Sequence, residues 1–212
     1  MQTPFIQTGP VDFDIDAREA KVIGSGQRIA PLAQEELTDA IRDLSGMIRS
    51  VFGVHDNSHI PDIFATLAKQ PGQYRCQLEL GKELVMNGAL PPRERELAVL
   101  RVGWLCRAPF EWGEHVDFGK KNGVTAEEVE RITRGSADPG WGEHDRAIVR
   151  AVEELVGDQA ISDATWAVLA KRWNDRQLME LPVLVGHYFL LAMLHNSLRF
   201  ALLEGNIGLR AR

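Results

Sequence analysis

The sequence predicts an all-α fold of about eight helices in one domain. Apolar residues recur at helical spacing along most of the chain, as at Leu37, Ile41, Leu44 and Ile48. Residues that commonly start and end helices border these stretches. No run alternates apolar and polar residues between turn signals, and no strand–helix–strand rhythm appears. A helical bundle is therefore favoured over a mixed or all-β fold.

The helical patterns follow one another with short breaks. Residues 1–30 contain several prolines and glycines and little periodicity, so we expect an extended arm that packs on a neighbouring subunit or stays mobile. Residues 31–212 are expected to form the helical domain. The helices are predicted over residues 34–51, 61–70, 73–86, 93–108, 109–122, 125–134, 143–157, 163–173 and 176–203.

Several helix starts carry a recognisable cap. Thr125 and Glu128 form a capping box, in which the hydroxyl accepts from the Glu128 amide and the carboxylate bonds back. Ser162 is expected to open the next-to-last helix and Asp175 the last and longest. These caps indicate where the helices of the second half of the chain begin.

Composition excludes several classes of partner. The net charge is −6 and the sequence pI is about 5.5, which argues against nucleic acid or an anionic membrane surface. The longest apolar run, Leu181 to Leu194, is too short to span a bilayer and contains His187. The N-terminus does not read as a signal peptide, and two isolated cysteines give no disulfide framework. A cytoplasmic protein is expected.

Residues 93–122 carry the strongest functional signal. Glu96 lies in a helix that is apolar on nearly all sides, and Pro109 starts a second helix in which Glu111 and His115 are four residues apart. A sharp turn at Pro109 would fold Glu111 and His115 back against Glu96. Two carboxylates and an imidazole form an acid/base set that can move a proton to or from carbon. The alternative is an ordinary surface pair of Glu111 and His115, with Glu96 as a satisfied core carboxylate.

Further polar residues are candidates for substrate binding. Arg93 and Arg101 flank Glu96 and could hold a substrate carboxylate, although arginines on helices are more often solvated or ion-paired. Trp112 is expected in the pocket wall. In the last helix, polar side chains at helical spacing either line the pocket or bond across a subunit contact: His187, Tyr188, His195 and Asn196.

The remaining histidines and cysteines are given structural roles. His55 and His59 are expected in an exposed loop, and His144 is also expected to be exposed because its loop is rich in glycine. Cys76 is expected as a small core residue and Cys106 as a buried structural thiol.

Several short stretches together resemble the carboxymuconolactone decarboxylase and alkylhydroperoxidase D-like superfamily. The resemblance covers roughly residues 30–205 and rests on three central runs: Glu94-Arg-Glu96-Leu-Ala-Val-Leu, Phe110-Glu111-Trp112-Gly-Glu-His115 and Asn122-Gly123-Val-Thr-Ala-Glu-Glu. Residues 163–166 and the stretch from Gly186 to Asn196 extend it. The resemblance implies an alkylhydroperoxidase D-like helical fold and a homo-oligomer, a trimer or hexamer.

The peroxidase branch of that superfamily does not match on residue types. It carries a glutamate, a Cys-x-x-Cys pair and a histidine four residues after the second cysteine. Alignment on Glu96 and His115 places Ala108 and Glu111 at the two cysteine positions, and Cys106 is two positions away without a resolving thiol. A thiol peroxidase is therefore disfavoured.

The decarboxylase-like branch implies a cofactor-independent lyase. The expected substrate is a small carboxylated lactone or related oxo acid, as in aromatic compound catabolism. His115 is expected as the proton donor or shuttle, Glu96 as the group that orients it, and Glu111 as a second carboxylate that shapes or protonates the substrate. Isomerisation, dehydration and lactone opening would need the same groups.

Two non-lyase alternatives remain at this level. Glu96, Glu111 and His115 could supply a metal site, but the same helix offers no further histidine, so no metal is expected. The chain could also be a non-catalytic oligomeric helical protein, because residues 97–105 and 183–194 are apolar around most of their girth.

Overall fold

A computed structural model describes residues 6–51, 53–56 and 58–212 of the chain. Within these ranges the protein forms ten α-helices and no strand, so the predicted all-α fold class is confirmed. The helices are α1 (Ile15–Val22), α2 (Asp39–Val51), α3 (Asp62–Leu67), α4 (Pro71–Lys82), α5 (Pro92–Leu105), α6 (Pro109–Lys121), α7 (Ala126–Arg134), α8 (Glu143–Asp158), α9 (Asp163–Leu169) and α10 (Asp175–Leu198). Three short turns complete them: η1 (Gln34–Glu36), η2 (Glu83–Asn87) and η3 (Gly208–Arg210).

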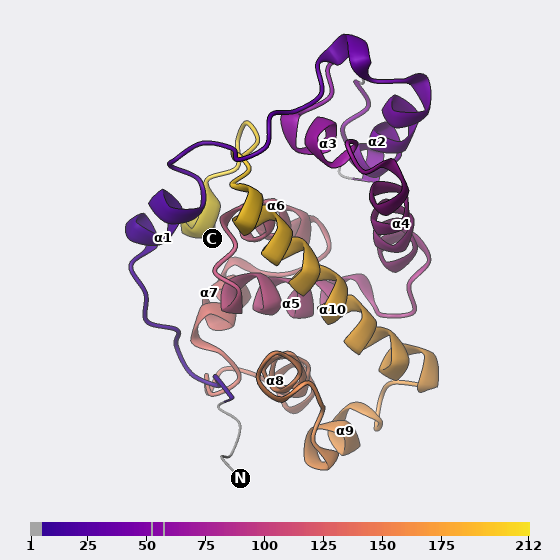
Figure 1. Cartoon of the computed structure of the whole chain (residues 1–212). Helices are drawn as coiled ribbons and strands as arrows, with labels where there is room; N and C mark the ends of the chain where they lie inside the picture. The colour runs from indigo at the N-terminus through magenta and orange to yellow at the C-terminus, as the bar shows by residue number, and fades with distance from the viewer. Residues whose placement is uncertain (1–5, 52, 57) are drawn as a thin grey trace.

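Helix α5 is the centre of the main core. Leu97, Ala98, Leu100 and Val102 are fully buried, as the all-round apolar pattern predicts. Helices α6, α7, α8 and α10 pack around α5, and α10 crosses the front of the molecule in Figure 1. The site residues on α5 and α6 are therefore held by a packed scaffold.

Helices α2, α3 and α4 form a separate lobe with a core of its own. This second core contains Leu37, Ile60, Ala65, Ala68 and Tyr74. The three helices lie together at one side of the molecule, apart from α7, α8 and α9 (Figure 1). A five-residue π-helical turn, η2, connects α4 towards α5. The molecule thus has two apolar cores, and a cavity lies between them.

The N-terminal segment differs from the predicted extended arm. Residues 15–22 form α1, which Asp14 caps by accepting from the Ala17 amide. Arg18 donates to the backbone oxygen of Arg107 at 2.9 Å, and Glu19 accepts from the Leu209 amide at 2.8 Å. The prediction is wrong for this segment because one helix of eight residues gives too little periodicity to detect. Residues 1–5 of the predicted arm lie outside the described residues.

Helix caps are confirmed in two cases and displaced in one. The Thr125–Glu128 capping box is present, and the Ser162 hydroxyl accepts from the Thr165 amide. The last helix starts after Asn174, whose side chain accepts from the Gln177 amide, rather than after Asp175. It ends at Leu198 instead of Leu203, because Arg199 adopts a left-handed conformation with φ of 59°.

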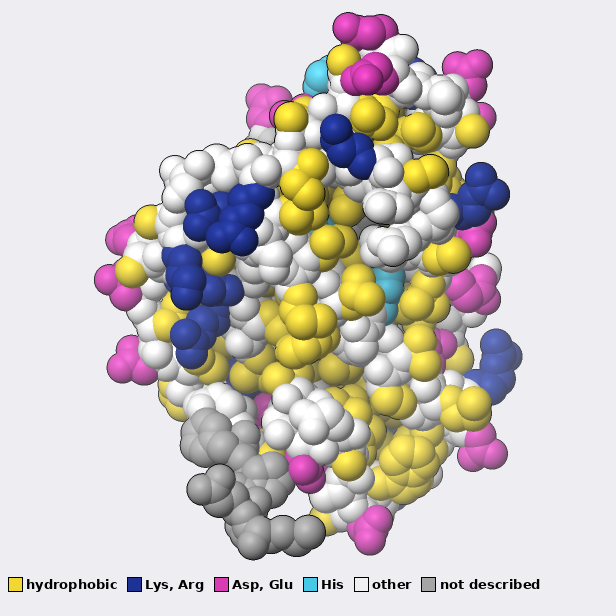
Figure 2. Space-filling view, viewed as in Figure 1, with side chains coloured by type: hydrophobic (Ala, Val, Ile, Leu, Met, Phe, Trp, Pro, Cys, Tyr) yellow, Lys and Arg dark blue, Asp and Glu magenta, His cyan; other side chains and the backbone are white. Residues whose placement is uncertain are grey.

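Helix α10 exposes an apolar face along part of its length. Met179, Val183, Leu190 and Met193 are 70, 48, 42 and 51% exposed. Apolar side chains cover much of the surface where α10 crosses the molecule (Figure 2). By length and composition α10 could cross a membrane, and 44% of its most apolar 18-residue segment is buried in the protein. This is weak evidence, since the core helix of a soluble protein meets the same criteria.

Candidate active site

Helices α5 and α6 bring the three predicted acid/base residues together. Both helices start with proline, and between them Arg107 adopts a positive φ of 50°, which reverses the chain. Gly119 of α6 faces α5, since an added Cβ there would lie 3.5 Å from the Glu96 Cβ, in ordinary van der Waals contact. The reversal places the α6 face that carries His115 against Glu96.

Glu96 and His115 form a fully buried pair. Nδ1 of His115 donates to Oε2 of Glu96 at 2.8 Å, and Nε of Arg95 donates to the other Glu96 oxygen at 2.9 Å. Glu96 is completely buried and His115 is 3% exposed. The carboxylate therefore fixes the orientation of the imidazole, whose Nε2 lies towards Glu111.

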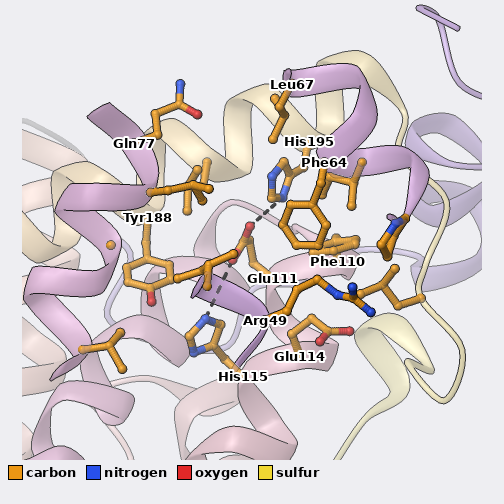
Figure 3. A pocket seen from close by; sticks show the side chains of 18 of the residues that line it. Arg49, Phe64, Leu67, Gln77, Phe110, Glu111, Glu114, His115, Tyr188 and His195 are labelled. Carbon is orange, nitrogen blue, oxygen red and sulfur yellow. Dashed lines mark ion pairs between the residues drawn. The ribbon is translucent and has the colours of Figure 1, made fainter. Parts of the chain in front are cut away.

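Glu111 forms a second pair with a histidine from the last helix. Its Oε1 lies 2.5 Å from Nδ1 of His195, although the ring is not aligned for a hydrogen bond. Its Oε2 lies 3.9 Å from Nε2 of His115 (Figure 3). Glu96, His115, Glu111 and His195 thus form a continuous series in which carboxylates and imidazoles alternate.

The charges of this series shift the pKa of His115 upward. Burial alone would lower it, but the charge of Glu96, the hydrogen bond to Glu96 and the charge of Glu111 outweigh burial. The protonated form of His115 is therefore favoured relative to that of a free histidine. An imidazolium with Nδ1 bound to Glu96 can offer its Nε2 proton to a substrate.

Glu111 behaves differently from a glutamate in an apolar pocket. Burial raises its pKa, but the charge of His195, the contact with His195 and the charges of His115 and His187 lower it below the ordinary value. The ionised form does not suit the substrate-protonating role that the resemblance allows for Glu111. Glu111 is ionised and can act as a base or stabilise a positive charge.

His187 and Tyr188 complete the polar wall on α10. Burial lowers the pKa of His187, with partial compensation by the charge of Glu111, so its imidazole is expected to be neutral. Burial also raises the pKa of Tyr188 well above its ordinary value, and this phenol stays protonated. The pKa of His115 is thus raised and that of His187 lowered, which separates an acid from a base. This pattern is typical of enzyme sites.

These groups line a cavity of about 480 Å³. The polar wall comes from α6 and α10, and the opposite wall from the α2–α4 lobe. The polar lining residues are Arg49, Gln77, Glu111, Glu114, His115, His187, Tyr188, His195 and Glu204. The apolar lining residues are Ile48, Val54, Pro61, Ile63, Phe64, Leu67, Leu78, Val85, Phe110, Leu191 and Leu203. Figure 3 shows Glu111 between His115 and His195 inside this enclosure.

Four of the predicted substrate-binding residues do not reach the cavity. Arg93 is ion-paired with Glu128 and with Asp145, and Arg101 is completely buried. The Arg101 guanidinium pairs with Glu153 and donates to backbone oxygens of Ile132 and Gln7. Trp112 is buried against Trp104 and donates to the Ala211 oxygen, while Asn196 donates to the Cys106 oxygen. All four have structural partners, and for the two arginines the reason is that the side of α5 that carries them faces α7 and α8.

Two expectations about burial are also wrong. His144 is only 7% exposed, with its ring packed edge-on against Trp173 and Nε2 3.4 Å from Glu94. It was expected in a loop but lies in the first turn of α8, which turns it inward. Cys76 is exposed rather than part of the core. The exposed positions of His55 and His59 are confirmed.

Cys106 is half-buried at the end of α5 and has no thiol partner among the described residues. Burial raises the pKa of its thiol to about 12. The thiol therefore stays protonated at neutral pH and is a poor nucleophile.

Sequence reasoning missed several lining residues. Arg49 and Gln77 enter the cavity from α2 and α4, and Arg95 supports Glu96 from its side. Their sequence neighbourhoods resemble ordinary amphipathic helices, so only the docking of the α2–α4 lobe reveals them. In the part of the chain that the structure describes, no three His, Cys, Asp or Glu side chains are placed to hold a metal ion.

Part of the sequence matches one known protein family. Residues 73–154 match the model of the carboxymuconolactone decarboxylase family. No curated protein matches the sequence.

Solved structures share the fold at low sequence identity. An uncharacterised peroxidase-related protein from Ralstonia eutropha, described as an alkylhydroperoxidase AhpD core, has a TM-score of 0.69 and 15% identity over 84% of this chain and 95% of its own. A peroxidase-related protein from a Silicibacter species has a TM-score of 0.68 and 11% identity, with 97% of each chain covered. The debrominase Bmp8 has a TM-score of 0.67 and 13% identity, covering 85% of this chain and 94% of its own.

These similarities show that the central helices carry the family pattern and that the whole helical domain has the AhpD-like fold. They agree with the motif around Glu96, Glu111 and His115. Residues 73–154 thus carry the carboxymuconolactone decarboxylase family pattern, in a chain that has the alkylhydroperoxidase D-like fold.

Proposed function

We propose that this protein is an enzyme that transfers protons to and from carbon in a small, mainly apolar organic molecule. The observation that carries the proposal is the alternating series Glu96, His115, Glu111 and His195, of which the last three line the cavity. Buried acid/base groups with pKa values shifted in opposite directions are a common mark of catalytic sites. The proposal invokes no cofactor.

His115 would act as the acid. Its ring lines the cavity with Nε2 3.9 Å from Oε2 of Glu111, while Glu96 holds Nδ1 and Arg95 donates to Glu96. Delivery of that proton to a carbanion or enolate would leave a neutral imidazole hydrogen-bonded to Glu96. Glu111 or neutral His187 would take up a proton elsewhere on the substrate, and His195 would compensate the charge of Glu111.

The finer form of the proposal is decarboxylation of a small carboxylated lactone or related oxo acid. The family model supports it by name. Loss of carbon dioxide leaves an electron pair on carbon, which a proton from His115 would quench. The predicted holders of the substrate carboxylate, Arg93 and Arg101, are engaged elsewhere. Arg49 lines the cavity and also donates to the His59 backbone oxygen, and it would take that role.

Isomerisation, dehydration and lactone opening would use the same groups. The cavity lining favours none of them, since it provides an acid, a base and an apolar wall in each case. The structural neighbours include a debrominase and peroxidase-related proteins, so the fold accommodates several reactions. A cytoplasmic location in aromatic compound catabolism fits this proposal.

The test is an assay of purified protein against carboxylated lactones and small oxo acids, with products identified by mass spectrometry. A compound that is turned over should lose roughly a hundred-fold or more in kcat with His115→Ala. The Glu94→Gln variant is the matched control, because Glu94 lies on the same helix as Glu96 but contacts Trp173 and His144. Full activity of His115→Ala on that compound would overturn the proposal.

A further inference from the structure

A second cavity adjoins the one that contains the acid/base groups. It has a volume of about 330 Å³ and lies between α3, α4 and the C-terminal end of α10. Leu67 and Gln77 line both cavities. These two side chains therefore form the partition between the chambers, and Figure 3 shows both at the edge of the first chamber away from His115.

The partition is weakly held. The side-chain oxygen of Gln77 is buried and has no hydrogen-bond partner among the described residues. Leu67 is the last residue of α3 and is only partly buried. A buried amide oxygen without a partner is costly, so rotation of Gln77 towards a ligand or water would be favourable. The Gln77 side chain can therefore rotate and open the passage without breaking a hydrogen bond at this oxygen.

The second cavity is apolar inside and polar at its edge. Ile29, Leu67, Leu194 and Leu198 supply its aliphatic surface. Its remaining residues include Lys69, Gln70 and Gln73, all of which are exposed. A ligand that enters this chamber would bury an apolar chain and present its far end to solvent.

We infer that the substrate is an elongated molecule whose reactive head lies beside Glu111 and His115 and whose apolar chain passes Leu67 and Gln77 into the second cavity. The inference rests on the proposed function for the position of the head. It adds a substrate class: a small polar or ring-shaped head, such as a carboxylated lactone or oxo acid, that carries an aliphatic tail. Gln77 would bind a donor on the ligand near the junction of head and tail.

The chain-length dependence of binding tests this inference without turnover. The probes are 4-n-alkylphenols from methyl to octyl, titrated into the intact protein by calorimetry. Each added methylene that becomes buried should lower Kd roughly fourfold. For the wild type, the gain should continue through the longer members because the tail enters the second cavity.

Leu194→Trp is the decisive variant, because Leu194 lines the second cavity and not the first. It should bind the short members like the wild type and lose the further gain of the long members. Leu198→Trp should do the same and provides a second test if Leu194→Trp folds poorly. Leu80→Trp is the matched control, since Leu80 is exposed on α4 and lines neither cavity.

Two results would overturn the inference. One is a wild-type affinity that stops rising at the short members, and the other is a Leu194→Trp profile identical to that of the wild type. The proposed function fails by a different route, through full activity of His115→Ala. The binding series and the activity assay therefore separate an error in the substrate class from an error in the chemistry.

Discussion

At the scale of single residues, the site depends on one imidazole held between two carboxylates. His115 contacts Glu96 through Nδ1 and faces Glu111 through Nε2. The raised pKa of His115 means that the folded protein binds this proton more tightly than the unfolded chain. This stabilisation is fully present below the unfolded pKa of about 6.5 and is lost as pH rises through the folded pKa.

The first prediction concerns that pKa. Glu96→Gln removes the charge that raises the pKa of His115, so the pKa should fall, because burial then dominates. Activity that requires protonated His115 should decline at a lower pH in this variant than in the wild type. The measurement is a titration of the histidine ring signals by NMR. Glu94→Gln should leave the His115 titration unchanged, and an equal titration in Glu96→Gln would contradict the assignment.

The second prediction concerns the thiols. Cys76 is exposed and Cys106 has a pKa of about 12, and neither occupies the position of a relay cysteine. The double variant Cys76→Ser, Cys106→Ser should keep full activity, and the wild type should reduce hydroperoxides no faster than an ordinary thiol protein. Peroxide consumption can be followed with dithiothreitol as the reductant. Turnover that disappears with Cys106→Ser would refute the non-redox account.

At the scale of elements, the sequence predicted what local chemistry encodes. The capping box at Thr125 and the cap at Ser162 were placed correctly because the capping residues lie within a few positions of one another. The end of α10 was placed five residues too late, because the apolar pattern continues past Arg199 and no glycine marks the end. Tertiary contacts of residues 200–212 with α1 and α6 decide that boundary.

The third prediction concerns the turn after α7. Gly135 has a φ of 81°, and an added Cβ would lie 2.5 Å from both the Arg101 guanidinium and the Thr8 oxygen. Gly135→Ala should therefore lower the free energy of unfolding by about 1–3 kcal/mol through backbone strain and overpacking. Gly72→Ala is the control, because nothing lies within 4 Å of that position and its change should be within about 0.5 kcal/mol. Urea denaturation measures both, and equal stabilities would contradict the role of Gly135.

At the scale of the whole molecule, the site lies where two apolar cores meet. The sequence predicted Glu96, Glu111 and His115 because they fall within 20 residues of one another in two adjacent helices. It left the roles of His187 and His195 open, and it placed Arg93 and Arg101 at the pocket although both face other helices. The orientation of α5 against α7 and α8, and the docking of the α2–α4 lobe, depend on contacts far apart in sequence. Those contacts produce no local pattern.

The fourth prediction concerns assembly, which we propose to be a homo-oligomer. The exposed face of α10 carries Met179, Val183, Leu190 and Met193, and apolar surface of this kind is often covered by another subunit. Sedimentation at micromolar concentration should show an oligomer, and Leu190→Glu with Met193→Glu should shift it towards monomer. Glu35→Lys is the control, because Glu35 is exposed in η1, away from this face, and its replacement should leave the oligomer unchanged. A wild type that sediments only as a monomer would contradict the proposal.

The account rests on proton transfer to carbon by His115, and solvent deuterium tests this step most directly. A compound that the wild type converts in deuterium oxide should yield product with one deuterium at the carbon that is protonated, as detected by NMR and mass spectrometry. In His115→Gln, both the rate and the incorporation should fall together, by roughly a hundred-fold. Product formed without deuterium at carbon, or formed at the wild-type rate by His115→Gln, would contradict the central claim.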